Sequence, residues 1–587
     1  MNKVFDQGRE NTSTILQLTS AQESIYFAHL LDIAGISLNI AHYREINGKI
    51  DADLLFRAID LVLDKTPAYR SVVKIINETP FLEIKHSVSS NLKIVELSTE
   101  EFPEKIAKAW VDQEWKKAFD LSTGPLFKYA VVKLGIGQFY LFTCVHHIIV
   151  DGSGVFQFER NVFDTYAALQ RGENVNAPVG PDNAFEFEKP YTSSSEFNED
   201  KTFWKTELAD VEPQISLSGR PSVVGRLFNR ARSSLSPNSI LSLKEFCHRN
   251  KISLQRALVV IGALYYTRMT GQRDFLIEIP VSLRRTREDF AAVDMRSSSV
   301  LLRLSYDPAT TLGEFIKIFS SQMRGALRHQ RYRREFIQKD FGRDKNFALF
   351  SINILPSSRV ELGKDISIKT NNLSNGPVKD VSINIYLGEY DSEVLLELDC
   401  NSSLYSKAES ALHLDRIKNL MYSCASSTAD QVIDLIPLID VSERNRVIST
   451  FNDTQQEIPS TTLPDLFGRQ VEKSPEATAL IFGDEEVSYR ELDCRANQLA
   501  RYLISHNIGP EDIVAIGLDR SVEMVVALLG VLKSGAAYLP LDPDYPVERL
   551  TFMLTDSNAK RLVTTKEIYD RLLGLSLIHI SEPTRPY

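Results

Sequence analysis

Strand-like and helix-like hydrophobic patterns alternate along nearly the whole chain, and the style of this alternation changes once, between residues 436 and 463. Before that point, β-branched and aromatic runs such as Gln138–Val150 are mixed with amphipathic helical runs such as Gly154–Gly172. After it, short apolar strands and helices follow one another regularly, which is typical of a parallel, doubly wound sheet. Both parts are therefore predicted to be α/β.

Two stretches, residues 175–200 and residues 436–463, indicate the domain boundaries. Residues 175–200 are rich in Pro, Ser and Asn, which indicates a boundary between two lobes. A length of about 150 residues per domain serves as a guide to the number of units. The predicted organisation is a tail 1–14, a first lobe 15–185, a second lobe 186–435, a linker 436–463 and a final domain 464–574.

The last thirteen residues, Leu575–Tyr587, fit neither style. "LSLIHISEPTRPY" matches the one-frame translation of a transposon end and adapter used to prepare short-read sequencing libraries. We therefore expect an artefact of sequencing and leave this segment out of the fold prediction. On this interpretation, the natural protein is longer than the printed chain.

Composition excludes several classes of partner. The formal net charge is -10 and the pI is near 5.7, so no overall field favours nucleic acid or anionic membranes. No run reaches the roughly 18 apolar residues of a membrane span, and no apolar secretory signal begins the chain, so we expect a cytoplasmic protein. Five cysteines without a CxxC pair argue against a zinc site and against disulfides, and indicate reduced core thiols.

The stretch "VHHIIVDGSG" contains the most informative side chains. A strand over Gln138–Val150, followed by a turn at Asp151–Gly154, would point His146 and His147 to opposite faces. Two such histidines cannot both bind one metal ion without a bulge, so no metal site is predicted. A pair of hydrogen-bonded core histidines stays open as the structural alternative.

The His-His-x-x-x-Asp-Gly pattern resembles the signature of condensation domains of nonribosomal peptide synthetases and their chloramphenicol-acetyltransferase-like relatives. Further segments that resemble family motifs in the same order are "LTSAQESIYF", "KTFWKTEL" with Phe203 and Trp204, "IEIPVSLRRTRED" with Arg284, and "RHQRYRREFI" with His329, Gln330 and Tyr332. The resemblance covers residues 15–435. It implies two acetyltransferase-like lobes that form a V-shaped cleft.

The resemblance implies a reaction and site roles. The amine of an acceptor aminoacyl thioester would attack a donor acyl or peptidyl thioester, both held on phosphopantetheine of partner carrier domains. His147 would act as base or positioning group, with His146 in support. Backbone N–H groups of the turn Gly152–Gly154, at the start of a helix, are expected to supply donors for the oxyanion. Asp151, paired with Arg284, would hold the turn.

Other histidines and one arginine-rich segment lie outside the signature motif. The isolated histidines are expected at surface or core positions: His29, His42, His86, His248, His413 and His506. The segment Arg328–Phe336 is expected to be either a solvated helix face or a docking surface for an acidic carrier domain. Together with "NGPVKDV" (Asn375–Val381), it resembles siderophore-type condensation domains such as that of the enterobactin synthetase. Ser297–Ser299 departs from the family's usual Asn, which puts the acceptor-side contacts in doubt.

Two later segments resemble the first motifs of adenylation domains. The residues that match are Tyr489, Glu491 and Leu492, and then Gly535, Tyr538, Pro540, Asp542 and Pro543. The Ser/Thr/Gly-rich loop that would cradle ATP does not occur, so no cofactor-binding residue is predicted in this part and ATP with magnesium is expected only in a full-length adenylation domain.

There are three alternatives to a condensation domain. An epimerisation domain shares the histidine pair, but the adenylation-like segment that follows favours condensation. A cyclisation domain would carry an Asp-based motif instead. A non-catalytic module of the same fold, which recruits carriers or partner enzymes, would tolerate the loss of His147.

Overall fold

The computed structural model describes residues 13–90, 92–173, 188–221, 227–342, 349–356, 366–388 and 391–572. The chain divides into two compact units, Met1–Phe451 and Asn452–Tyr587, so the division falls inside the predicted linker 436–463. The 575–587 segment lies outside the described residues, as does nearly all of the predicted tail 1–14.

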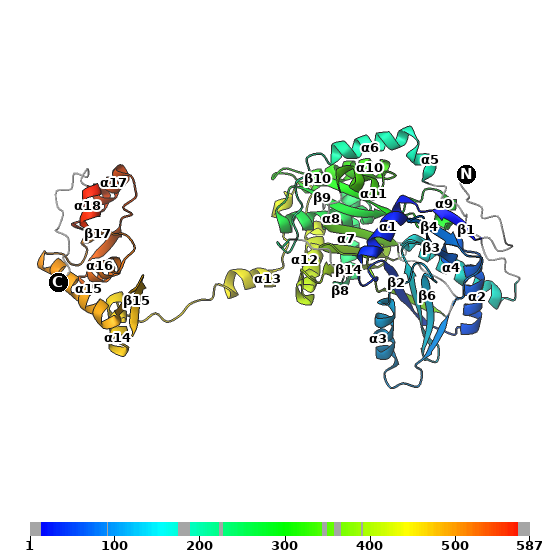
Figure 1. The fold of residues 1–587 in the computed structure, drawn as a ribbon, viewed down its shortest axis with the longest axis horizontal. Coiled ribbons are helices and arrows are strands. Elements are labelled where there is room, and N and C mark those ends of the chain that lie inside the picture. Colours follow the sequence, from blue (N-terminus) through cyan, green and yellow to red (C-terminus); the bar gives the residue numbers. More distant parts are fainter. Residues whose placement is uncertain are drawn as a thin grey trace. The chain divides into compact units, whose positions relative to one another are not determined.

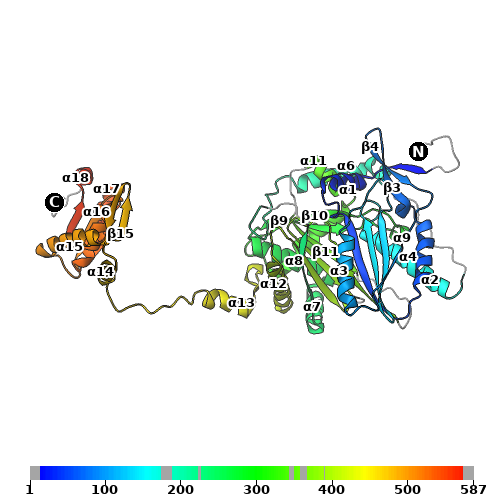
Figure 2. The same ribbon diagram turned by 60° about the horizontal axis from the view of Figure 1, so that its bottom comes forward.

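The first lobe is built on a five-stranded sheet with the strand order β12-β2-β7-β6-β5. Its strands are β2 (Asn39–Asn47), β5 (Lys93–Glu96), β6 (Phe127–Gly135), β7 (Gln138–His146) and β12 (Ser367–Asn372). Helix α3 (Pro103–Trp115) lies on one face, and α2 (Ala52–Asp64) and α4 (Gly152–Gln170) lie on the other (Figure 2). Because both faces are covered, both sets of alternating residues of β7 are buried.

The N-terminal helix α1 (Ser20–Leu31) begins one residue before the position that the sequence suggested. Ser20 and Glu23 have the spacing of a capping box and would predict Ser20 as the N-cap, whereas the observed box pairs Thr19 with Gln22. Thr19 has extended backbone and its side chain accepts the N–H of Gln22, which is the geometry of an N-cap. The strand just before this helix, β1 (Thr14–Gln17), belongs to a small sheet with the order β1-β4-β3. The other two strands are β3 (Ser71–Ile76) and β4 (Thr79–Ile84).

The second lobe contains a six-stranded mixed sheet with the order β10-β9-β11-β13-β14-β8. Its strands are β8 (Phe228–Ser234), β9 (Asp274–Val281), β10 (Ser298–Ser305), β11 (Phe350–Pro356), β13 (Val381–Leu387) and β14 (Val394–Asn401). Its helices are α5 (Lys189–Thr192), α6 (Ser195–Glu207), α7 (Pro237–Asn250), α8 (Leu254–Thr270), α9 (Arg287–Ala291), α10 (Leu312–Arg328), α11 (Arg334–Phe341) and α12 (Lys407–Ser426). Helix α8 is buried around most of its circumference, which marks it as the centre of this core.

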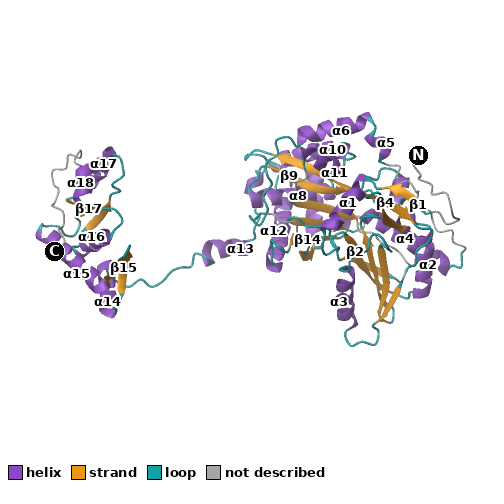
Figure 3. Ribbon diagram, in the orientation of Figure 1, coloured by secondary structure: helices purple, strands orange, loops and turns teal. Residues whose placement is uncertain are grey.

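One strand crosses between the lobes. Strand β12 belongs by sequence to the predicted second lobe, 186–435, but it pairs antiparallel with β2 of the first lobe, with Asn371 opposite Tyr43. The sequence boundary at residue 185 therefore does not separate two independent lobes, because backbone hydrogen bonds of one sheet join them. Strands and helices are mixed throughout both lobes (Figures 1 and 3).

The second unit has the strand–helix alternation that its sequence predicted. Three parallel strands have the order β18-β17-β19, and a hairpin of β15 and β16 precedes them. The strands are β15 (Thr478–Phe482), β16 (Glu485–Ser488), β17 (Ile513–Gly517), β18 (Ala537–Pro540) and β19 (Arg561–Thr564). The helices are α14 (Leu463–Lys473), α15 (Tyr489–Ser505), α16 (Val522–Lys533), α17 (Val547–Ser557) and α18 (Lys566–Leu572), and α13 (Val441–Asn445) precedes them in the first unit.

The described residues test three expectations about membrane spans, metal sites and cysteines. None of their helices has the length and apolarity needed to cross a membrane. No group of three potential metal-binding side chains occurs among them. Four cysteines are buried, but Cys494 is exposed, so the prediction that all five are core thiols is wrong for that residue.

Candidate active site

The histidine pair lies where β7 turns into α4. The strand ends at His146, not at Val150 as its composition suggested, because the chain turns at once. The N–H of Ile149 donates to the carbonyl of His146 over 3.3 Å, and the N–H of Ile148 donates to the Nδ1 atom of the same residue over 3.2 Å. His147 therefore lies in the turn, beyond the strand whose alternation was used to orient it.

His146 is completely buried. Its Nε2 atom lies 3.2 Å from Nδ1 of His29 on α1, and the two rings meet edge to face. Burial, followed by the neighbouring His29 and His147, lowers the pKa of His146 to about 3. The ring is therefore neutral at physiological pH. His29, which the sequence suggested was an isolated histidine, is in fact its hydrogen-bond partner.

His147 is less buried than its neighbour and retains partial exposure. Its backbone N–H donates to the carbonyl of Leu38 over 2.9 Å. Its Nδ1 atom is buried and has no hydrogen-bond partner within the described part of the chain. Burial lowers the pKa of His147, while the nearby Asp151 carboxylate acts in the opposite direction. The imidazole is therefore neutral as well.

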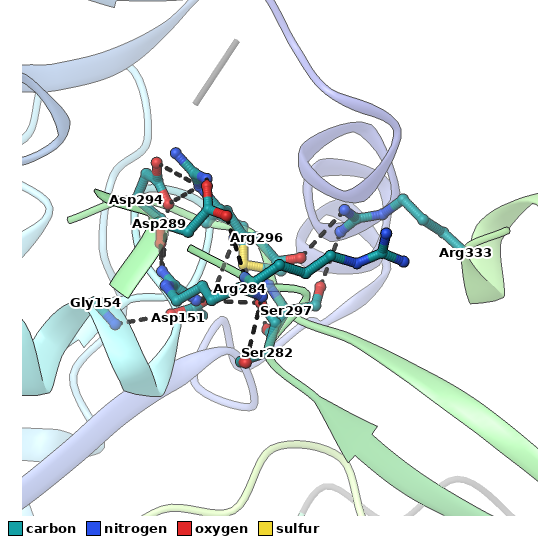
Figure 4. A network of polar contacts seen from close by, with 11 residues as sticks. Asp151, Gly154, Ser282, Arg284, Asp289, Asp294, Arg296, Ser297 and Arg333 are labelled. Atoms are coloured by element: carbon teal, nitrogen blue, oxygen red, sulfur yellow. Dashed lines mark hydrogen bonds and ion pairs between the residues drawn. The ribbon is translucent and has the colours of Figure 1, made fainter. Parts of the chain in front are cut away.

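Asp151 is the N-cap of α4 and is 1% exposed. One carboxylate oxygen accepts the N–H of Gly154 over 2.8 Å. The other accepts Nη1 of Arg284 over 2.7 Å and the backbone N–H groups of Arg296 (3.0 Å) and Ser297 (2.7 Å), as Figure 4 shows. Burial opposes the charged form, but Arg284 and these donors outweigh it and lower the pKa of Asp151.

A wider charge network surrounds this ion pair (Figure 4). The guanidinium of Arg284 is inaccessible to solvent, and its Nη2 lies 3.3 Å from Asp294. Arg296 in turn binds Asp294 over 2.9 Å and Asp289 over 2.5 Å. Arginines and aspartates alternate through the network, so each buried charge has an opposite neighbour.

The two glycines of the turn differ in their surroundings. A Cβ atom on Gly152 would meet nothing within 4 Å, whereas one on Gly154 would lie 2.5 Å from Val150 and 3.0 Å from the carbonyl oxygen of Asp294. The N–H of Gly154 is already bound to Asp151. The prediction that the whole Gly152–Gly154 turn supplies oxyanion donors is therefore wrong for Gly154, the glycine at which a Cβ atom would meet backbone of Asp294.

The arginine-rich segment is neither a solvated face nor a docking surface over its whole length. Arg333 and Arg334 are 4% and 6% exposed. Arg333 donates to the backbone carbonyls of Arg296 and Ser297 over 3.1 and 2.8 Å. Arg331 pairs with Glu196 over 2.6 Å. The segment thus supports the loop that holds Asp151.

The serines that replace the family's Asn have three separate contacts. The N–H of Ser297 binds Asp151, as described above. The hydroxyl of Ser298 accepts the N–H of Arg334 over 3.3 Å, and the hydroxyl of Ser299 donates to Glu278 over 2.5 Å. The stretch therefore links the turn of the first lobe to β9 and α11 of the second.

Sequence reasoning missed four residues of this site, namely His29, Asp294, Arg296 and Arg333. His29 and His146 are 117 positions apart, and Arg296 and Asp151 are 145 apart. None of the four belongs to a local pattern with Asp151 or the histidines. Buried arginines beside aspartates are a general sign of paired charge, but this sign does not identify the partner.

The adenylation-like residues occupy structural positions in the second unit. Leu492 is buried in α15, and the hydroxyl of Ser488 caps that helix. Gly535 has a φ of +86° just after α16, a conformation that glycine adopts readily. Tyr538 and Pro540 lie in β18.

Comparisons with known proteins agree with this architecture. Residues 12–445 match the "Condensation domain" family, and residues 467–584 match the "AMP-binding enzyme" family, a match that runs into the 575–587 segment. The chain is 34% identical over 559 residues to the dimodular nonribosomal peptide synthase of Bacillus subtilis (strain 168), covering 94% of this chain and 23% of that protein. It is 28% identical over 571 residues to enterobactin synthase component F of Escherichia coli O157:H7, covering 94% and 43%.

Two solved structures share the fold. The starter condensation domain of rhizomide synthetase, a mutant in complex with C8-CoA, has a TM-score of 0.68 at 24% identity and covers 72% of this chain and 98% of that one. A four-domain nonribosomal peptide synthetase bound to AMP and glycine has a TM-score of 0.78 at 19% identity and covers 98% and 45%. The V-shaped cleft between the lobes stays a prediction. Because the family match spans most of its length, the chain belongs to the condensation-domain family of nonribosomal peptide synthetases, with an AMP-binding segment after the condensation domain.

Proposed function

We propose that the first unit joins two carrier-bound thioesters through an amide bond. The acceptor would be an aminoacyl thioester and the donor an acyl or peptidyl thioester, each on the phosphopantetheine arm of a carrier domain. The observation that carries this proposal is the partly exposed, neutral ring of His147, held in the turn between β7 and the Asp151-capped helix α4.

The chemistry requires positioning more than strong base catalysis. An α-amino group has a reference pKa of about 7.7 to 8.0, so about 1 kcal/mol frees the amine near pH 7. Its nitrogen bonds to the donor carbonyl carbon, a tetrahedral oxyanion forms, the C–S bond breaks and the thiol leaves. The nitrogen must lose one proton in this sequence, and a neutral imidazole is suited to accept it.

The buried Nδ1 of His147 limits how the ring can act. Because that nitrogen is enclosed, Nε2 is the atom that would meet the amine. A general base and a positioning group need the same hydrogen bond, and our proposal includes both roles. His146, fully buried and neutral, would support the ring without touching substrate.

Two backbone donors remain for the oxyanion. The N–H groups of Gly152 and Ser153 lie in the first turn of α4, where the helix dipole favours negative charge. We assign the oxyanion contact to Gly152 or Ser153, since the N–H of Gly154 is already bound. Asp151 and Arg284 would act as structural residues that hold this turn.

The proposal extends to the kind of assembly line in which the chain acts. One relative carries the name enterobactin synthase component F. Together with the "RHQRYRREFI" and "NGPVKDV" segments, this likeness supports a siderophore-type assembly line as the context of the chain.

A single-turnover assay of amide formation tests the function. Acyl-coenzyme A donors (octanoyl and benzoyl) would be paired with aminoacyl N-acetylcysteamine acceptors (leucyl and glycyl), and the amides measured by mass spectrometry. We expect His147→Ala to slow amide formation by about 10²- to 10⁴-fold and to leave the melting temperature unchanged.

The exposed His248 on α7 supplies the matched control, and His248→Ala should behave as wild type. Equal rates for wild type and His147→Ala would favour the non-catalytic docking module. The absence of amide product with every probe pair would contradict the proposed reaction.

A further inference from the structure

Helix α1 contacts the histidine turn from outside the signature motif. His29, in the last turn of α1, places Nδ1 3.2 Å from Nε2 of His146. The ring centroids are 5.0 Å apart at an interplanar angle of 78°. His29 is partly exposed, whereas His146 is completely buried. This pair therefore connects the buried interior beside His147 to the surface of α1.

The hydrogen bonds determine the tautomers of both rings. The N–H of Ile148 donates to Nδ1 of His146, so this nitrogen carries no proton. A neutral His146 must then carry its proton on Nε2, which donates to Nδ1 of His29. His29 in turn must accept at Nδ1, which requires its own ring proton to be on Nε2.

Two further contacts tie the same turn to the N-terminal segment. Nε2 of Gln22, on α1, donates to the carbonyl of Ile148 over 3.0 Å. The carbonyl of Leu38, shortly after α1, accepts the N–H of His147 over 2.9 Å. The turn is therefore held by α1 and the segment after it at three consecutive residues, 146, 147 and 148.

We propose that His29 is a positioning residue for the condensation reaction, which accepts the Nε2 proton of His146 and so holds the orientation of that ring and, through it, the place of the His147 ring. The inference rests on the proposed function, because it assigns His29 a role in that chemistry. His29 itself would not touch substrate. Its role is to present an acceptor at Nδ1 to a ring that has no other described partner for its Nε2 proton.

The charged and titratable groups that face His29 set the conditions for this contact. They are His146 on β7, Asp32 after α1, and Asp120 from the segment after α3. Burial lowers the pKa of His29, and Asp32 and Asp120 act in the opposite direction. When His29 takes up a proton, its Nδ1 changes from acceptor to donor and faces the Nε2–H of His146. Amide formation should then lose rate at acidic pH in step with His29.

Two substitutions separate this role from simple packing. In His29→Asn, the side-chain oxygen lies near the former Nδ1 position and can accept from His146, whereas His29→Leu removes the acceptor. With octanoyl-CoA and leucyl-N-acetylcysteamine as probes, His29→Leu should lower kcat by about 10- to 100-fold with little change in KM. His29→Asn should stay near wild type and lose the His29 part of the acidic limb of the pH profile.

His248→Leu is the matched control, because His248 is also a histidine in the last turn of a helix and is exposed. Full activity of His29→Leu in an active wild-type background would overturn the inference and leave the proposed function intact. Equal loss in His29→Asn and His29→Leu at unchanged melting temperature would also overturn it.

A second measurement does not depend on activity or on the variants folding. In the wild-type chain with ¹⁵N-labelled histidine, the shifts of His146 should show Nε2 protonated and Nδ1 bare. Protonation at Nδ1 would refute the inference whether or not the wild type forms amides, whereas an inactive wild type with the expected tautomer would count against the proposed function alone.

Discussion

The turn from His146 to Gly154 is held differently at its two ends. At the Asp151 end, one carboxylate accepts four hydrogen bonds, and a second set of charges surrounds its guanidinium partner. At the histidine end, the contacts are between neutral groups, and Nδ1 of His147 is buried without a described partner. Each charge at the first end has an opposite partner, whereas the second end presents a partly exposed, neutral imidazole.

The largest expected effect comes from breaking the charged end. Asp151→Ala leaves Arg284 buried without its closest carboxylate and removes the cap of α4. The free energy of unfolding should fall by about 3 to 5 kcal/mol, measured by urea denaturation followed by circular dichroism. A loss below about 1 kcal/mol would mean that the pair is no stronger than an exposed salt bridge.

A smaller effect is expected from crowding the same end. Gly154→Ala places a methyl group 2.5 Å from Val150 and 3.0 Å from the carbonyl oxygen of Asp294. Such overpacking against backbone typically costs about 1 to 3 kcal/mol. Gly152→Ala is the control, since its methyl group meets nothing and Ala favours a helix. Equal denaturation midpoints for the two variants would show that the backbone around Asp294 yields.

The histidine end should respond to pH instead. The pKa of His146 is lowered to about 3 in the folded chain, so only the unfolded chain takes up this proton between about pH 6.5 and 3. The contribution of His146 to the free energy of unfolding is therefore fully present above pH 6.5. It falls as the pH drops, by about 1.4 kcal/mol for each pH unit. Comparing denaturation of wild type and His146→Asn between pH 5 and 7 isolates this slope. Parallel curves for the two proteins would show that His146 is not held neutral.

Much of the fold could be predicted from local patterns, and the exceptions have physical reasons. The second unit has the regular strand–helix alternation that its hydrophobic pattern predicted, because short apolar runs between turn residues behave alike in any parallel sheet. Strand β7 ends four residues before the predicted end. The N–H of Ile148, which a longer strand would use in the sheet, donates instead to the Nδ1 atom of His146. Strand β12 joined the other lobe, since pairing partners distant in sequence leave no periodic signal.

In the candidate site, too, the sequence identified residues that are close together in the chain and missed partners that are distant in it. His146, His147, Asp151 and Gly152 are adjacent in the chain, so their resemblance to a known motif identified them at once. Arg284 was also expected, through a second motif. His29, Asp294 and Arg296 were missed, because a buried charge or ring needs a partner but does not specify where in the chain that partner lies.

The sequence by itself determined the α/β class, the order of the lobes, the family and the histidine–aspartate turn, because these depend on residue types and spacings within short segments. Only the tertiary structure decided which nitrogen of His147 is enclosed, which glycine is indispensable for packing, and which distant side chains hold the turn. The distant side chains His29 and Arg296 lie more than a hundred residues from the residues that they bind, and burial changes the free energy of each such charge and hydrogen bond.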